Sequence, residues 1–198
     1  EGFQELTGTV NSDNVKYVKA GVGGTPSELG MLRYERDVLN DGKITPDVVV
    51  IEFAVNDLGD ETEGRCYDSL VRKIYDGPGN PAVILLFAVF QDDFNLQERL
   101  IPVGKAYDLM MISMKRSAFQ YLDDKWTRQE YYFDQYHPTS LGHNVMADCI
   151  LHGVELAESA PADEADLAYP AKPAFGLNFM GLKSIFRDQI DPALGLET

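Results

Sequence analysis

Short apolar runs that alternate with amphipathic segments are the feature that most limits what this chain can fold into. Four runs are predicted to be strands, at residues 15–20, 47–54, 82–90 and 109–114. The two strongest, DVVVIEFA and AVILLFAVF, are apolar at successive positions, which is typical of strands covered on both faces. Such strands belong to a parallel sheet, whose strands are joined by crossover helices.

The segments between the runs have helical spacing. Thr25, Pro26 and Glu28 have the pattern of an N-cap, a first helical residue and a capping box, and Leu29, Leu32 and Leu39 follow on one face. A second helix is predicted whose apolar face consists of Cys66, Tyr67, Leu70, Val71 and Ile74. A third is predicted from about Gln97 to Tyr107, with Pro102 inside it, and a last one from about Leu141 to Leu156. The order of elements predicts an open, doubly wound α/β sheet. Functional groups in such sheets gather at the carboxyl ends of the strands.

The charge of the chain excludes several classes of partner. The 198 residues carry a formal net charge of −15, which repels phosphate backbones and anionic lipid. We therefore expect no nucleic-acid binding, and no apolar run approaches the roughly 20 residues that span a bilayer. Cys66 and Cys149 are too few for a zinc site or a disulfide scaffold, and both are expected to be buried small hydrophobes rather than a bridge.

The length fits one domain, or one domain with a short extension. Residues 1–160 are predicted to form the α/β domain, and the proline-containing and acidic stretch 161–175 is predicted to be a linker. Residues 176–198 are then a C-terminal extension or the start of a β-rich accessory module. The chain starts without Met or a signal peptide, so the compartment cannot be read from the sequence.

A glycine-rich turn, AGVGGT, follows the first predicted strand at residues 20–25. Glycines let a backbone approach a ligand closely, and a helix N-terminus offers free N–H groups to negative charge. The turn lacks the lysine of a phosphate-binding loop. A tight strand-to-helix turn is the alternative interpretation.

The second polar turn, AVND at residues 54–57, ends the most hydrophobic strand. A side-chain amide at a strand end can donate a hydrogen bond to a developing oxyanion, which makes Asn56 a candidate. An Asn-Asp pair is also an ordinary turn signal.

The third turn, DQYHP at residues 134–138, precedes the last predicted helix. A spacing of three residues lets the Asp134 carboxylate reach the His137 imidazole, which fixes the tautomer and leaves the second ring nitrogen as a general base. A structural ion pair in a loop is the alternative.

Taken together and in this order, the three turns resemble the conserved blocks of the SGNH/GDSL hydrolase family. The resemblance runs from about Val15 to Ile150 through AGVGGTPSELG, IEFAVNDLGD and DQYHPTSLGH. It implies a three-layer α/β/α, flavodoxin-like serine esterase or lipase that needs no cofactor or metal. The sequence of this stretch is most similar to bacterial members of the family that deacetylate carbohydrates. The resemblance therefore implies a small-molecule or polysaccharide ester as the substrate.

The resemblance also implies roles for individual residues. Gly24 falls at the backbone donor of the oxyanion hole and Asn56 at its side-chain donor, while Asp134 and His137 match the triad partners of the nucleophile. One departure is small, because Ala54 stands where the family often has Gly.

A larger departure is that the family's first block, Gly-Asp-Ser, is absent. Ser12 is the only serine before Gly21, and it lies in a polar stretch with no apolar strand before it. We therefore expect the nucleophilic serine, and the central strand that presents it, to lie outside this sequence. The sequence is then part of a larger protein or is completed by another chain; replacement of that strand by the C-terminal tail is a weaker alternative.

Other assignments stay open at this point. Ser27 and Thr25 are weak substitutes for the nucleophile, and His143 and His152 lack the spacing of a metal site. The aromatic residues around the third turn, Trp126, Tyr131, Tyr132, Phe133 and Tyr136, fit either core packing or a sugar-stacking wall. The competing functions are a non-catalytic protein that binds carbohydrate or another ligand and a flavodoxin-like nucleotide-binding module.

Overall fold

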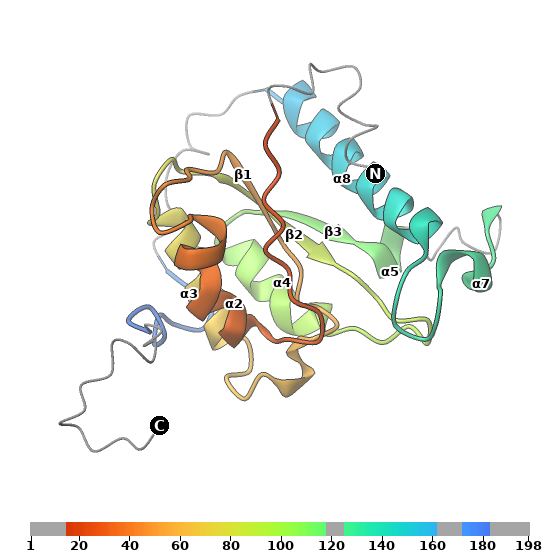
Figure 1. Ribbon diagram of the computed structural model, residues 1–198, viewed down its shortest axis with the longest axis horizontal. Helices are drawn as coiled ribbons and strands as arrows, with labels where there is room; N and C mark the ends of the chain where they lie inside the picture. Colours follow the sequence, from red (N-terminus) through yellow and green to blue (C-terminus); the bar gives the residue numbers. More distant parts are fainter. Residues whose placement is uncertain (1–14, 118–124, 162–171, 183–198) are drawn as a thin grey trace.

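The computed structural model describes residues 15–117, 125–161 and 172–182. At the centre of these residues lies a sheet of three parallel strands, β1 (Val48–Ile51), β2 (Ala82–Phe87) and β3 (Met110–Ser113), in the order β1-β2-β3 (Figure 1). The register pairs Ile51 with Leu85 and Phe87 with Ser113. The carboxyl ends of all three strands therefore meet at one edge of the sheet.

Helices connect the strands. The crossover segments contain α2 (Ser27–Arg33), a π-helical turn (Tyr34–Val38), a 3-10 turn (Asp57–Gly59), α3 (Arg65–Tyr75) and α4 (Gln97–Ala106). After β3 come the short helices α5 (Met114–Ser117) and α7 (Arg128–Tyr131) and the long helix α8 (Ser140–Ser159). None of the helices within the described ranges is long and apolar enough to cross a membrane.

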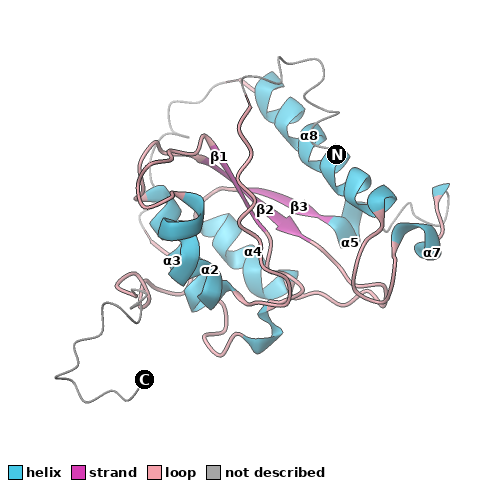
Figure 2. Ribbon diagram, viewed as in Figure 1, coloured by secondary structure: helices cyan, strands magenta, loops and turns pink. Residues whose placement is uncertain are grey.

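The two faces of the sheet have separate cores. Val83, Leu85 and Phe87 of β2 pack in one buried cluster with side chains of α2, α3 and α4. Ile84 and Leu86 point to the opposite face and pack in a second cluster with α8. Figure 2 shows the three strands between α8 and the pair α2 and α3. The predicted three-layer α/β/α fold is confirmed.

Periodic apolar spacing predicted the helices well. In α3 all five expected side chains are buried, namely Cys66, Tyr67, Leu70, Val71 and Ile74. Pro102 lies inside α4 as expected, and α8 is a few residues longer than predicted. Cys66 is buried and Cys149 half-buried, and both thiols are free.

The predicted first strand at residues 15–20 is wrong. This segment is extended but belongs to no strand, and 71% of Tyr17 is exposed. A strand forms only beside a hydrogen-bonding neighbour, and among the described residues β1 pairs with β2 alone. The face of β1 opposite the α2–α4 layer is also uncovered, since Val48 is 53% and Val50 43% exposed.

The predicted N-cap of α2 is also wrong. The helix begins at Ser27 with Pro26 in the cap position, and Thr25 Oγ1 donates to the carbonyl of Val22 instead. The backbone N–H of Ser27 donates to Asp57 Oδ1 over 2.7 Å, so the cap comes from a residue thirty positions away. The capping box of this structure is formed elsewhere, by Thr127 and Glu130 at the start of α7.

Residues 172–182 pack against the α/β domain. The buried carboxylate of Asp68 accepts the backbone N–H groups of Phe175 (2.6 Å) and Gly176 (3.1 Å). Ala174, Phe179 and Met180 extend the core cluster around α3. We call residues 172–182 the C-terminal strap. The rest of the predicted linker and extension, and Ser12, lie outside the described residues.

Candidate active site

The turn between α7 and α8 holds Asp134 and His137 in one hydrogen-bonded unit. Phe133 N donates to the carbonyl of His137 over 2.8 Å, which closes the turn. Asp134 Oδ1 accepts the backbone N–H groups of Tyr136 (2.8 Å) and His137 (2.7 Å). Its Oδ2 lies 2.8 Å from His137 Nδ1. The backbone thus fixes the carboxylate, and the carboxylate orients the ring.

The electrostatics of this turn suit a general base. The hydrogen bond to His137, helped by the two backbone N–H groups, lowers the pKa of Asp134 to about 2. An ionised carboxylate at Nδ1 favours the tautomer with its proton on Nδ1, so Nε2 has a free lone pair. The His137 side chain is 74% exposed, and no group within the described ranges bonds to Nε2.

Asn56 stands in a tight turn just after β1. Asn56 N and Asp57 N both donate to the carbonyl of Phe53, over 3.0 and 2.9 Å. Ala54 is fully buried, and its carbonyl accepts from Leu96 N over 2.7 Å. Asn56 itself is partly exposed, so its side-chain amide can reach a ligand at this edge of the sheet.

Gly24 lies in an exposed turn before α2. Its φ is +70°, in the left-handed region that favours glycine. A Cβ at Gly21, Gly23 or Gly24 would meet no atom within 4 Å, so the backbone is open on that side. The Ser27–Asp57 hydrogen bond joins this turn to the Asn56 turn. Ser27 lies three positions after Gly24, and Asp57 directly follows Asn56.

The loop after β2 contacts both of the other turns. Leu96 bonds to Ala54 in the Asn56 turn, and Gln91 N donates to the carbonyl of Gln135 over 3.1 Å. Phe90 packs edge-to-face on Tyr136, with ring centroids 4.9 Å apart. Three segments distant in sequence are therefore connected, through Asp57 and this loop, at the carboxyl edge of the sheet.

The aromatic residues of this region divide into two groups. Tyr131 and Tyr132 are buried in the core under α8, and Trp126 packs partly against the same cluster. Phe133 and Tyr136, by contrast, are 82% and 50% exposed on either side of the Asp134 turn. Core packing therefore explains the first group but not the second.

Four carboxyl groups near the Asn56 turn were not identified as site residues from the sequence, where only Glu28 was named and only as part of a capping box. Burial raises the pKa of Glu28 and of Glu52 to about 7 and that of Asp57 to about 6. Burial also disfavours the charged form of Asp60, but hydrogen bonds, chiefly from Thr62 and Gly64, leave its pKa lowered. Side chains from α2 and from the segment that follows β1 meet here only through the fold, so local spacing gave no signal.

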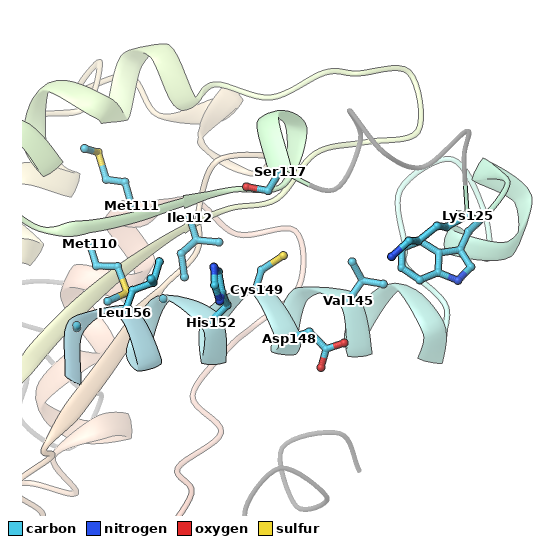
Figure 3. Close-up of a pocket in the computed structure, with 13 residues that line it drawn as sticks. Met110, Met111, Ile112, Ser117, Lys125, Val145, Asp148, Cys149, His152 and Leu156 are labelled. Carbon is cyan, nitrogen blue, oxygen red and sulfur yellow. The ribbon is translucent and has the colours of Figure 1, made fainter. Parts of the chain in front are cut away.

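A groove lies away from these turns. It encloses about 930 Å³ between β3 and α8, and Figure 3 shows Cys149 and His152 facing it beside Ile112. None of Gly24, Asn56, Asp134 and His137 lines it, although Trp126 does. No cluster of metal-ligating side chains occurs among the residues that the structure describes, and His143 and His152 are both exposed on α8.

Comparison with known proteins decides the family. Residues 2–145 match the model of the GDSL-like lipase/acylhydrolase family. The chain belongs to this family. No curated protein matches the sequence of this GDSL-like chain.

Two similar solved structures are crystal structures of a two-domain esterase (CEX) active on acetylated mannans, one of them co-crystallised with mannopentaose. Each is 30% identical to this chain, with TM-scores of 0.76 and 0.78. The alignments cover 86% and 91% of this chain but only 46% and 47% of the esterase. The GDSL-like chain thus spans less than half of the length of that esterase.

Proposed function

We propose that this chain supplies the base and the oxyanion hole of a serine ester hydrolase that removes acyl groups, most simply acetyl, from carbohydrate. The hydrogen-bonded Asp134–His137 pair, at the sheet edge where the Asn56 turn lies, is the observation that supports this best. Membership of an acylhydrolase family and likeness to an esterase support the reaction class.

The proposed reaction uses a serine outside the 198 residues. His137 Nε2 removes the proton from the serine hydroxyl as its oxygen attacks the ester carbonyl. The Gly24 N–H and the Asn56 amide stabilise the tetrahedral oxyanion. His137 then gives the proton to the leaving alkoxide, which departs as the alcohol and leaves an acyl-serine. Water next attacks this acyl-serine while His137 takes the water's proton, and His137 returns the proton to the serine oxygen as the carboxylic acid leaves.

The uncovered edge of the sheet supports a nucleophile from elsewhere. Among the described residues no strand pairs with the outer edge of β1, although Val48 and Val50 are apolar and exposed beside it. Unpaired backbone groups and exposed valines are costly in an otherwise buried parallel sheet. A further parallel strand ending in Gly-Asp-Ser would pair with that backbone edge and would bring a serine to the carboxyl edge.

Two observations support a carbohydrate ester as substrate. The structural neighbours are active on acetylated mannans. The exposed rings of Phe133 and Tyr136 flank the Asp134–His137 turn, and flat apolar rings with polar surroundings suit the faces of sugar rings.

The test uses the full-length protein that contains this sequence. A fluorophosphonate probe should label one serine outside residues 1–198, and p-nitrophenyl acetate and an acetylated mannan should both be hydrolysed. Absence of labelling and of turnover would contradict the proposal. Binding of mannan without labelling would instead support the second candidate, a non-catalytic carbohydrate-binding protein, which the exposed rings of Phe133 and Tyr136 would also suit.

A further inference from the structure

Asp57 is fully buried, yet its carboxylate is not part of the proposed reaction. One oxygen, Oδ1, accepts the backbone N–H of Ser27 over 2.7 Å. Asp57 is also fixed by its own backbone, since its N–H donates to the Phe53 carbonyl and its carbonyl accepts from Arg99 Nη1 over 2.9 Å. The carboxylate thus extends from a rigid turn to Ser27 at the start of α2, where the backbone N–H and the side chain both favour its charged form.

The two ends of this hydrogen bond lie next to the two proposed oxyanion donors. Asp57 directly follows Asn56, and Ser27 follows Gly24 after Thr25 and Pro26. Pro26 is extended, with φ −79° and ψ 174°, and its ring restricts the link between Gly24 and Ser27. A change in the Ser27–Asp57 separation therefore moves the Gly24 N–H relative to the Asn56 amide.

Position matters greatly for an oxyanion hole. Two donors stabilise the tetrahedral oxygen only if both lie about 2.7–3.1 Å from it, and a displacement of about 1 Å can lower the rate about 100-fold. The Gly24 turn is exposed, and no atom lies within 4 Å of where its Cβ would be. The hydrogen bond from Thr25 Oγ1 to the Val22 carbonyl stays within the turn, whereas the Ser27–Asp57 bond ties it to the Asn56 turn.

We propose that Asp57 is a positioning residue, whose hydrogen bond to Ser27 N sets the spacing between the Gly24 and Asn56 donors. The inference rests on the proposed function and adds a residue to it. Asp57 touches no substrate, so its loss should lower kcat and leave the KM for a small ester nearly unchanged.

The experiment measures the hydrolysis of p-nitrophenyl acetate by the full-length protein and its variants. Asp57→Ala should lower kcat about 10- to 100-fold with KM within about threefold, and Asp57→Asn, which keeps an acceptor oxygen, should recover most of the loss. Ser27→Pro removes the donor instead of the acceptor, at a first helical position where proline is tolerated. It should lower kcat similarly, and the double variant should be no slower than the slower single variant.

Asp68→Ala is the matched control. Asp68 is also a fully buried carboxylate that accepts backbone N–H groups, but it holds the C-terminal strap. Its loss should destabilise the fold and leave kcat within about threefold. A kcat for Asp57→Ala within threefold of that of Asp68→Ala, or additive losses in the Ser27→Pro double variant, would overturn the proposal.

A second readout separates this inference from the proposed function. Hydrogen exchange at the Ser27 amide should become faster in Asp57→Ala and remain slow in Asp68→Ala, whether or not the protein hydrolyses esters. Unchanged exchange in Asp57→Ala overturns the positioning role. A wild-type protein without turnover or fluorophosphonate labelling overturns the esterase proposal, and with it a role for Asp57 in catalysis.

Discussion

Asp134 Oδ2 lies 2.8 Å from Nδ1 of His137, while Oδ1 of the same carboxylate accepts the backbone N–H of His137 over 2.7 Å. One side chain therefore fixes both the ring and the backbone of the proposed base. Because the backbone holds Asp134 in place by itself, the orientation of the ring does not depend on a bound substrate.

Asp134→Asn tests this arrangement. Asparagine keeps an acceptor for the turn, but its amide group next to Nδ1 favours the tautomer in which Nε2 is protonated and cannot act as a base. We expect kcat for p-nitrophenyl acetate to fall about 10⁴-fold, with little change in KM or in the melting temperature. A loss below about tenfold would show that Asp134 does not set the tautomer of His137.

The C-terminal strap gives a prediction about stability. Asp68→Ala leaves the N–H groups of Phe175 and Gly176 without their acceptor, so the free energy of unfolding should fall by about 2–4 kcal/mol. Chymotrypsin should then cut after Phe179 of the strap faster than in the wild type. Asp68→Asn keeps an acceptor and should lose less. Equal stability and proteolysis in all three proteins would show that the strap does not depend on Asp68.

Glu28 predicts how stability depends on pH. Burial, followed by its contact with Asp60, raises the pKa of Glu28 from its ordinary value of 4.5 to about 7. The folded state therefore binds this proton more tightly than the unfolded state, and stability falls as pH rises from about 4.5 through 7. Glu52 and Asp57 act in the same direction.

Glu28→Gln should reduce this dependence. We expect the loss of unfolding free energy between pH 5 and pH 8, measured by urea denaturation, to be about 1–3 kcal/mol smaller in the variant than in the wild type. An isosteric change at an exposed acid, Glu158→Gln, is the control and should leave the loss unchanged. Identical pH dependence in Glu28→Gln and the wild type would contradict the assignment.

Phe133 tests the proposed substrate class. Because this ring is 82% exposed, Phe133→Ala should leave the fold stable. Loss of a stacking ring should raise the KM for acetylated mannan about 3- to 10-fold, while the KM for p-nitrophenyl acetate should not change. Leu156→Ala, at an exposed apolar residue on α8, should alter neither value. Equal effects on both substrates would remove Phe133 from carbohydrate binding.

Local patterns predicted the elements whose stability is decided locally. The spacing of Cys66, Leu70 and Ile74 defined the buried face of α3, and the apolar run at 82–90 located β2 because β2 is covered on both faces. The run at 15–20, VKYVKA, is weaker because it contains two lysines, and a strand also needs a hydrogen-bonding neighbour. No described strand lies next to β1 on that side, so apolar residues alone gave the wrong answer there.

Long-range polar contacts could not be predicted from spacing. The local pattern predicted Thr25 as the N-cap of α2, but the Ser27 N–H, the first of the helix, donates to Asp57, thirty residues away. Asp68 similarly holds the strap over more than a hundred residues. In both cases a buried carboxylate bonds to a backbone that only the fold brings near. The short turn of Asp134 and His137, by contrast, was predicted correctly because both partners lie within three residues.

The central claim is that His137 is the base of an ester hydrolase. The most direct test is kcat for p-nitrophenyl acetate in the full-length protein with His137→Ala, alongside His143→Ala as a histidine control on α8. We predict a loss of about 10²–10⁴-fold for His137→Ala and no loss for the control. Undiminished turnover by His137→Ala would contradict the account.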